Sequence, residues 1–524
     1  MPDNNAVPDN NAVPVNGAVL TADVVVVGFG AAGACAALEA AAVQEGGRVI
    51  VIDRFGGGGA TALSGGVVYA GGGTPQQEAA GVSDSPEAML AYLRSEAGDA
   101  VPEATLKEFC EGSVAMLAWL EGHGVPFEGS LCPYKTSYPT NRHYLYYSGS
   151  EMSRADIAEP APRGHRAKGR GTSGKLLYAR LAAACAASPR ITVVAQTAAK
   201  ELITDESGKV TGIQCLSLRD APVWARAAHA IAHRLSKKPH LYMPKVGRVL
   251  HRPVAAIERR YARPLTIAAG RGVILAAGGF AANRAMMREH APQARGALPL
   301  ATAGDDGGGI GLGTRAGGAT ALLDRVSVWR FLTPPPALTG GVLVDKHGAK
   351  ICDQTLYGAA IGAEIVRRGG RAWLLADSAT IRQARGQVRG TTLWFQQIQA
   401  RYLLSRAGKV TAPTLEAVAA KAGVDGAGLL ATAGAVTGYQ PPFSLIDCSV
   451  RPSLFFPAPV LTLGGLVVDQ ETGQVLREDG DAITGLYAAG RTAVGICSGS
   501  YVSGLSIADC VFSGRRAGRH AAGA

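Results

Sequence analysis

A tyrosine and a serine stand two positions apart near the end of the chain, directly before a segment with helical character. They are Tyr501 and Ser503 in SGSYVSGLSIADCVFSGRRAG, residues 498–518. A phenol donates a hydrogen bond while staying neutral at pH 7, and its ring tolerates apolar neighbours. A serine before a helix is also a common N-cap. The pair therefore either faces a bound molecule or only begins the helix, and its spacing does not decide between the two.

A glycine-rich turn near the other end of the chain has the spacing of a dinucleotide-binding fingerprint. A β-branched run, residues 24–27, leads into Gly28, Gly30 and Gly33, and an alanine-rich helical stretch follows to about residue 44. Gly28 allows the tight turn, Gly30 lets the backbone approach a pyrophosphate, and Gly33 lets helix and strand pack closely. The helix N-terminus adds backbone amides and a favourable dipole. We predict a dinucleotide site here, the alternative being a glycine-rich turn of another α/β fold.

The segments expected around such a cofactor also end in small or polar residues. A second apolar strand, residues 48–52, ends at Asp53, whose carboxylate is placed to accept hydrogen bonds from ribose hydroxyls. The loop at residues 54–73 has little side-chain bulk and suits a flat ring and its phosphates, although a surface loop is the alternative. Residues 271–283 and 484–492 are expected to contain further buried strands that stop at Ala and Gly. Together these segments predict a cofactor lying across strand ends.

The length of 524 residues and a hydrophobic content of 47% suit two domains with large cores. Residues 283–445 are richer in aromatic residues and proline and are expected to form a cap domain. The flanking segments, residues 21–282 and 446–524, carry the cofactor motifs. Residues 1–20 repeat a polar six-residue unit, lack the features of a secretion signal and are predicted to form a disordered tail.

Cysteine usage bounds the possible chemistry. The nine cysteines contain no C-x-x-C pair, which argues against a zinc ribbon, a cysteine-ligated cluster or a c-type haem, and we predict no metal site. Reduced thiols are the simplest interpretation, and no apolar run reaches membrane-spanning length. These features favour a cytoplasmic location.

Residues 221–265 carry most of the formal net charge of +11. They contain ten Lys and Arg and one acid, Glu258, so they contribute +9, and they interrupt the cofactor domain between two strands. Because the excess charge belongs to one insert, we expect no nucleic-acid binding. The apolar residues that fall roughly on one helical face are Val223, Trp224, Ala227, Ile231 and Leu235. A basic amphipathic helix can lie on an anionic bilayer, which would make the protein peripheral to a membrane; a solvated insert or an oligomer contact are the alternatives.

Taken together, these motifs resemble those of the fumarate reductase and succinate dehydrogenase-like FAD flavoproteins. The resemblance covers most of the chain from residue 21. It rests on the fingerprint at residues 28–33 with Asp53, on TALSGG (61–66), on VILAAGGF (273–280), and on TLGGLVVD, GLYAAGRT and SGLSIADCVFSGRRAG (462–518). It implies an α/β fold: a Rossmann-type FAD-binding domain built from both chain ends, with an inserted α+β substrate or cap domain.

Departures from the family pattern narrow the substrate. Dicarboxylate reducers carry a histidine before the GG of the late strand, but residues 462–465 read TLGG, and their carboxylate-binding arginine and histidine set has no match. A covalent flavin would need a histidine near Ala60 or Thr61, so FAD is expected to bind noncovalently. The remaining likeness, through Tyr501, Ser503 and AAGRT, is to 3-ketosteroid dehydrogenases of the 3-oxo-5α-steroid 4-dehydrogenase type.

This resemblance implies desaturation of steroid ring A, preferably between C4 and C5 of a 5α-3-oxosteroid. Tyr501 would polarise the carbonyl, Ser503 would accept the neighbouring proton or start a relay, and Tyr357 would pass the proton on, while a hydride goes to flavin N5. The alternatives are a Δ1-dehydrogenase of the same ring, another fumarate-reductase-like flavoenzyme, and a noncatalytic FAD-binding redox partner. The electron acceptor is expected to be diffusible and quinone-like. The tyrosine-rich segment at residues 134–147 either lines the pocket or is a packed loop.

The resemblance also implies which residues contact FAD. Backbone amides at the start of the C-terminal helix would stabilise negative charge at the flavin N1/O2 edge. The residues expected at the cofactor are Gly28, Phe29, Gly30, Ala31, Ala32, Gly33, Asp53, Arg54, Thr61, Ser64, Gly65, Gly66, Ala198, Ala277, Gly278, Asp306, Gly490, Arg491, Gly504, Leu505 and Ser506.

Overall fold

A mainly parallel sheet forms the centre of the larger part of the protein. The computed structural model describes residues 18–43, 47–434 and 438–523. The sheet order is β19-β20-β9-β1-β2-β6, and β1 pairs in parallel with β2 and β9. These strands are β1 (Ala18–Val27), β2 (Val49–Asp53), β6 (Ile191–Ala195), β9 (Arg263–Leu275), β19 (Gln474–Leu476) and β20 (Ala482–Ala488). The β-branched run at residues 24–27 is buried, as expected for a strand covered on both faces.

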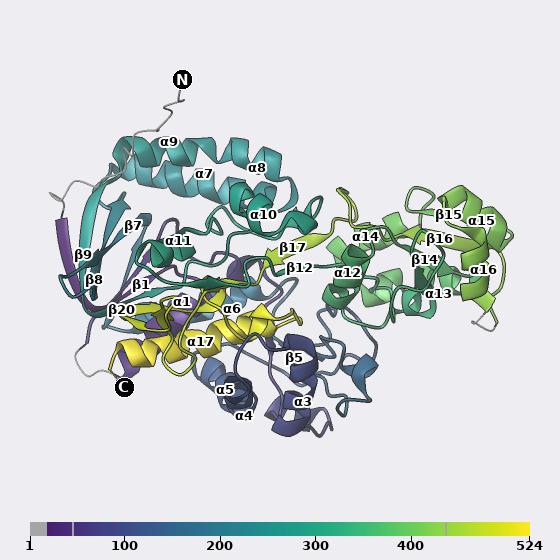
Figure 1. Cartoon of the computed structure of the whole chain (residues 1–524), viewed down its shortest axis with the longest axis horizontal. Coiled ribbons are helices and arrows are strands. Elements are labelled where there is room, and N and C mark those ends of the chain that lie inside the picture. The colour runs from purple at the N-terminus through teal and green to yellow at the C-terminus, as the bar shows by residue number, and fades with distance from the viewer. Residues whose placement is uncertain (1–17, 44–46, 435–437, 524) are drawn as a thin grey trace.

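Two helices from opposite ends of the chain pack against each other beside this sheet. They are α1 (Ala31–Val43) and α17 (Leu505–Ala521), seen together in Figure 1, and α6 (Gly174–Ala187) also contacts α1. Glycines let α17 approach: a Cβ at Gly514 would lie 2.5 Å from the carbonyl oxygen of Ala32, and one at Gly518 would overlap the carbonyl oxygen of Ala36. The two chain ends therefore form one Rossmann-type α/β unit, which confirms the predicted fold class.

The basic insert is helical and leaves the sheet at one edge. Strands β7 (Thr197–Thr204) and β8 (Val210–Ser217) form an antiparallel pair, and β8 joins β9. Between β8 and β9 the chain forms α7 (Val223–Tyr242), α8 (Pro244–Leu250) and α9 (Arg252–Tyr261), which lie together across the top of Figure 1. Within the described residues, no helix is both long and apolar enough to cross a bilayer.

The predicted FAD-binding domain, which contains α1 and α17, also includes several shorter elements. They are β3 (Val67–Tyr69), β4 (Leu145–Tyr146), β5 (Gly164–Arg166), α2 (Pro75–Ala79), α3 (Pro86–Ala97), α4 (Glu103–Glu111) and α5 (Ser113–Gly122). The three strands form a small antiparallel sheet, and β3 contacts α17.

A separate lobe with its own core forms the cap (Figure 1). Its antiparallel sheet has the order β13-β14-β16-β15. The elements are β13 (Val342–Val344), β14 (Trp373–Ala376), β15 (Lys409–Ala412), β16 (Phe443–Asp447), α12 (Gly358–Arg367), α13 (Ser378–Thr391), α14 (Trp394–Leu403), α15 (Leu415–Ala422) and α16 (Gly426–Gly434). The chain also forms two small sheets, one of β10 (Leu298–Pro299), β12 (Val326–Val328) and β17 (Pro459–Thr462), and one of β11 (Thr320–Ala321) with β18 (Gly465–Leu466). Figure 1 shows β12 and β17 between this lobe and the central sheet.

The structure changes one end of the predicted tail and suggests a different start for the cap domain. The prediction of a disordered tail is wrong for residues 18–20, because they begin β1 and pair with β9; residues 1–17 lie outside the described residues. The domain limits stay a proposal. Helices α10 (Arg284–His290) and α11 (Gly308–Arg315) precede the cap sheet, and α11 contacts β7 and β9. We therefore propose that residues 283–315 belong with the FAD-binding domain rather than with the cap.

The α1–α17 contact generates a stability prediction. Gly518→Ala places a methyl group against the α1 backbone, so we expect the free energy of unfolding to fall by about 1–3 kcal/mol. Gly386 is the matched control, because it is exposed in α13 with nothing within 4 Å of a Cβ. Alanine at position 386 is expected to raise stability by about 0.5–1 kcal/mol. Chemical denaturation measures both, and equal effects would contradict the close helix contact.

Candidate active site

A cleft of about 730 Å³ runs across the carboxyl ends of β1, β2 and β9. Thirteen of the residues expected at the cofactor line it: Gly28, Phe29, Gly30, Ala31, Ala32, Asp53, Arg54, Thr61, Ala198, Ala277, Gly278, Asp306 and Arg491. The others do not line this cleft; they are Gly33, Ser64, Gly65, Gly66, Gly490, Gly504, Leu505 and Ser506. The cleft therefore lies where parallel sheets bind nucleotides.

The fingerprint glycines have separate steric roles. Gly28 has a φ of +103°, and a Cβ there would lie 2.5 Å from the carbonyl oxygen of Ala276. A Cβ at Gly33 would overlap the carbonyl oxygen of Gly28, so this glycine allows α1 to pack on β1 and need not touch a ligand. At Gly30 the nearest atom to a Cβ is the Thr61 Oγ1, at 3.4 Å, so this backbone is open to the cleft. The turn thus fits the pyrophosphate of a dinucleotide.

Asp53 holds two loops as well as facing the cleft. Its Oδ2 accepts a hydrogen bond from the Phe29 amide (3.1 Å), and its Oδ1 accepts from the amides of Phe55 (2.8 Å) and Gly57 (3.0 Å). The carboxylate therefore ties the fingerprint turn to the loop after β2. A ribose hydroxyl, if bound here, would share a carboxylate that already has backbone partners.

The basic insert forms part of the cleft wall, which the sequence did not predict. Arg54 donates to Glu258 of α9 from Nε (3.1 Å) and Nη2 (2.8 Å), and its Nη1 lies 3.2 Å from Asp306. His229 Nε2 lies 3.3 Å from Glu258. Burial opposes the charge on Glu258, but hydrogen bonds with His229 and Arg54 outweigh it and lower the pKa to about 2. An ion-paired clamp therefore joins the insert to the edge of the cleft.

Two side chains of α7 reach the cleft itself, His233 and Lys237. The His233 ring stacks on Phe55 with centroids 3.8 Å apart and an angle of 5° between the planes. Burial lowers the pKa of His233 to about 3, so this ring is neutral at pH 7. Burial also lowers the pKa of Lys237, while nearby Asp53 raises it. The signal in the sequence was the pair His229 and His233, one helical turn apart on the face opposite the apolar residues.

The three residues expected to act on the substrate lie together where the cap meets the FAD-binding domain. Tyr501 and Ser503 precede α17, and Tyr357 is the residue before α12. The rings of Tyr357 and Tyr501 have centroids 6.1 Å apart, and Trp329 stacks on Tyr501 at 4.7 Å. Their meeting was not predictable from spacing, because Tyr357 belongs to a different lobe.

The capping interpretation of Ser503 fails, and a fourth residue joins the cluster. The N-cap of α17 is Gly504, which has a φ of +95°, so the helix starts without a side-chain cap. The Ser503 hydroxyl instead lies 3.1 Å from the hydroxyl of Tyr146, in β4. Burial raises the pKa of Tyr146, Tyr357 and Tyr501, which keeps the phenols neutral and able to donate. The sequence predicted Tyr146 only as one member of the tyrosine-rich segment at residues 134–147.

The loop at residues 147–151 holds this cluster against the domain. Ser148 Oγ donates to the carbonyl of Ser503 (3.0 Å), and the Tyr357 amide donates to Ser150 Oγ (3.1 Å). The Gly149 amide donates to Glu151, and the carbonyl of Gly149 accepts from Lys135. Burial raises the pKa of Glu151 and lowers that of Lys135. One short loop therefore positions groups from both lobes.

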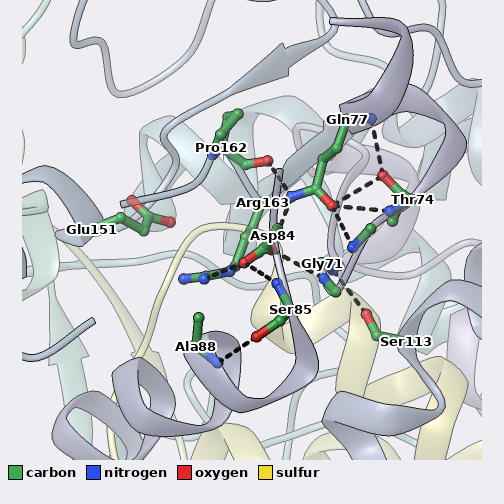
Figure 2. Close-up of polar contacts among 12 residues, drawn as sticks. Gly71, Thr74, Gln77, Asp84, Ser85, Ala88, Ser113, Glu151, Pro162 and Arg163 are labelled. Carbon is green, nitrogen blue, oxygen red and sulfur yellow. Dashed lines mark hydrogen bonds and ion pairs between the residues drawn. The ribbon is translucent and has the colours of Figure 1, made fainter. Parts of the chain in front are cut away.

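A buried ion pair lies beside this loop (Figure 2). Arg163 donates to Asp84 from Nη2 (2.6 Å) and Nε (2.9 Å), and both side chains are almost without exposure. Gln77 also donates to Asp84 (3.0 Å). Burial favours the neutral form of Asp84, but the hydrogen bond with Arg163 outweighs it and lowers the pKa. Removing one partner would leave an uncompensated buried charge, so loss of either side chain would strongly destabilise this region of the domain.

Lys237 generates a prediction about cofactor affinity. Lys237→Met keeps most of the buried stem and removes the ammonium from the cleft wall, so we expect the Kd for FAD to rise about tenfold, as for the loss of one charged hydrogen bond. Titration of the apoprotein with FAD, followed by flavin fluorescence, measures this Kd. Lys238→Met is the control, because Lys238 is exposed. If the two variants bind FAD with the same Kd, Lys237 does not contribute to the cofactor site.

Known proteins share both the sequence and this architecture. The family described as FAD binding domain matches residues 23–504. The chain is 36% identical over 497 residues to 3-oxo-5-alpha-steroid 4-dehydrogenase of Comamonas testosteroni, covering 89% of this chain and 92% of that protein. The structure of 3-ketosteroid-Δ4-(5α)-dehydrogenase from Rhodococcus jostii RHA1, in complex with 4-androstene-3,17-dione, is similar with a TM-score of 0.81 and 30% identity, covering 97% of this chain and 98% of that one.

A second group of relatives shares the fold alone. The structure of 3-ketosteroid Δ1-dehydrogenase from Sterolibacterium denitrificans has a TM-score of 0.63 at 20% identity, covering 96% of this chain and 99% of that one. These findings confirm the family resemblance, the class of enzyme and the cofactor predicted from the motifs. The chain belongs to the FAD binding domain family of flavoproteins and is an FAD-dependent oxidoreductase.

Proposed function

We propose that this chain oxidises ring A of a 3-ketosteroid, forming the C4–C5 double bond of a 5α-3-oxosteroid. The observation that carries the proposal is the cluster of Ser503, Tyr146, Tyr357 and Tyr501 at the junction of the two lobes. Similarity to the 3-oxo-5-alpha-steroid 4-dehydrogenase of Comamonas testosteroni over nearly the whole chain supports the same reaction.

The roles of the residues follow from their chemistry. Tyr501 donates a hydrogen bond to the substrate carbonyl, which increases the acidity of the neighbouring carbon. Ser503 accepts the proton lost from that carbon and passes its own hydroxyl proton to the oxygen of Tyr146 or Tyr357, because a serine alone is a weak base. That phenol releases its own proton in turn to water in the cleft beside Tyr357, so every hydroxyl of the relay ends neutral. The bound FAD supplies the acceptor for the hydride that leaves the adjacent carbon. Loss of one proton and one hydride leaves the double bond.

Access to this cluster involves the cap. The small cleft beside Tyr357 has a volume of about 10 Å³ and is also lined by Lys135, Phe331 and Ile361. A steroid is far larger, so substrate entry would require the cap to move away from the FAD-binding domain. Trp329 and Phe331, whose ring centroids lie 5.6 Å apart, would then offer apolar surface to the substrate.

We further propose that a diffusible, quinone-like acceptor reoxidises the flavin. Residues 309–318, whose glycine spacing is similar to a second fingerprint, mostly form α11, and a Cβ at Gly309 would lie about 3 Å from Thr492 and Ala277. This segment therefore contributes Gly309, Leu312 and Arg315 to the lining of the FAD cleft, and it gives no support to a second, nicotinamide-binding site.

A substrate panel tests the reaction. With a soluble quinone as acceptor, we expect turnover of 5α-3-oxosteroids and none of succinate. Turnover of 4-ene-3-oxosteroids alone would instead identify Δ1 chemistry. Absence of turnover with every steroid, in protein that retains its FAD spectrum, would leave another organic substrate or a noncatalytic redox role.

Replacing Tyr501 tests the carbonyl donor. Tyr501→Phe keeps the ring stacked on Trp329 but removes the hydroxyl, so we expect kcat to fall about 10²–10³-fold with FAD content unchanged. Steady-state kinetics and the flavin absorption spectrum measure the two quantities. Loss of a preorganised donor lowers kcat much more than about twofold. A variant kcat within about twofold of the parent value would therefore exclude Tyr501 from this role.

A further inference from the structure

Helix α7 presents a row of large apolar residues to solvent, while its buried face includes His229, His233 and Ser236. Trp224, Ile231, Leu235 and Tyr242 are 60%, 59%, 66% and 60% exposed. Their spacing of seven, four and seven residues places them in one stripe along the helix. A surface helix normally has the opposite arrangement, because burial of apolar area stabilises the fold.

The buried face of α7 explains why the stripe is not needed for folding. That face carries His229 against Glu258, His233 against Phe55, and Ser236 at 3.2 Å from His251 Nδ1. These contacts fix the rotation of the helix about its axis. The apolar stripe is therefore held outward by contacts of the same helix face that lines the FAD cleft with His233.

The next helix extends this apolar surface. In α8 and at its junction with α7, Met243, Val246, Val249 and Leu250 are all exposed. A Cβ at Gly247 would overlap the α7 backbone at His240, so the two helices are in close contact. Clustered apolar exposure on this scale marks an interaction surface rather than scattered surface hydrophobicity.

The charge around the apolar surface is of one sign. Five exposed basic residues belong to the same two helices: Arg226, Arg234, Lys238, Lys245 and Arg248. The single acid of the insert, Glu258, is engaged by Arg54. None of the ten Lys and Arg at positions 221–265 forms an ion pair within the part of the chain that the structure describes. A partner must therefore be anionic at its surface and apolar just beneath it.

We propose that α7 and α8 dock on the surface of an anionic lipid bilayer, with the apolar stripe in the headgroup region and the basic side chains at the phosphates. A second copy of the chain is disfavoured because it would bring two insert charges of +9 together. Nucleic acid would leave the apolar stripe without a partner. The inference rests on this surface and not on the proposed reaction.

Vesicle flotation tests the docking surface with the FAD-loaded protein. We expect the parent protein to float with phosphatidylcholine vesicles that contain phosphatidylglycerol and to stay below phosphatidylcholine alone. Ile231→Ser with Leu235→Ser should lower the bound fraction at least about tenfold. Trp394→Ser with Ile398→Ser is the matched control, because this pair has the same spacing in α14 and is 72% and 51% exposed. The control pair should bind as the parent does.

A charge variant separates the electrostatic contribution. Arg234→Glu with Lys238→Glu should abolish the preference for phosphatidylglycerol without releasing FAD, because neither residue lines the cleft. Parent protein that ignores both vesicles, or insert and cap variants that float equally, would overturn the proposal. A fall in sedimenting mass on replacing Ile231 and Leu235, without lipid, would assign the face to a second copy. Steroid turnover is measured separately with soluble substrate, so either proposal can fail alone.

Discussion

Close backbone packing between the two chain ends is the constraint on which this structure depends. Gly33 allows α1 to lie against β1, and Gly514 and Gly518 allow α17 to lie against α1. Because α17 begins directly after Tyr501 and Ser503, the position of that loop is set through backbone contacts with the fingerprint helix. A bulky side chain at Gly33 would push α1 away from β1, and one at Gly514 or Gly518 would separate α17 from α1. Either change would move the cofactor cleft and the tyrosine cluster apart.

Two ion pairs also fix the positions of parts of the structure, and the effect of losing each pair depends on how deeply it is buried. The pair of Arg163 and Asp84 lies within the domain beside the loop at residues 147–151, whereas the pair of Arg54 and Glu258 ties the insert to the edge of the cleft. The first is almost without solvent exposure, so loss of either partner would leave an uncompensated charge. The second remains partly exposed and is weaker by the same argument. Loss of the first pair would therefore destabilise the region beside this loop more than loss of the second would weaken the contact between the insert and the edge of the cleft.

The insert connects two properties that appear unrelated in the sequence. Its histidines face the FAD-binding domain, and this leaves the apolar residues of α7 in solvent. The side chain of His233, which lines the FAD cleft, and the apolar residues of the proposed lipid contact therefore lie on opposite faces of one helix. A flavoenzyme that acts on an apolar substrate would gain from such an arrangement, because the surrounding bilayer concentrates the substrate near the protein.

The sequence by itself determined the features that lie close together along the chain. The spacing of Gly28, Gly30 and Gly33 between a buried strand and a helix was sufficient for the dinucleotide cleft, because those residues act through one continuous turn. The order of the later motifs was sufficient for the family. The limits of the cap and the start of β1 were harder to predict from the sequence, since a short apolar run does not reveal which strand it pairs with.

Only the tertiary structure decided which distant residues meet. Tyr146 lies 357 positions from Ser503, and nothing in either local sequence specifies that their hydroxyls lie 3.1 Å apart. The periodicity of α7 showed that the helix has two faces, but it did not show that the histidine face is buried. The rotation of α7 is fixed by contacts with Phe55, Arg54 and Glu258, because packing and ion pairing between separate elements determine which face of a helix is buried.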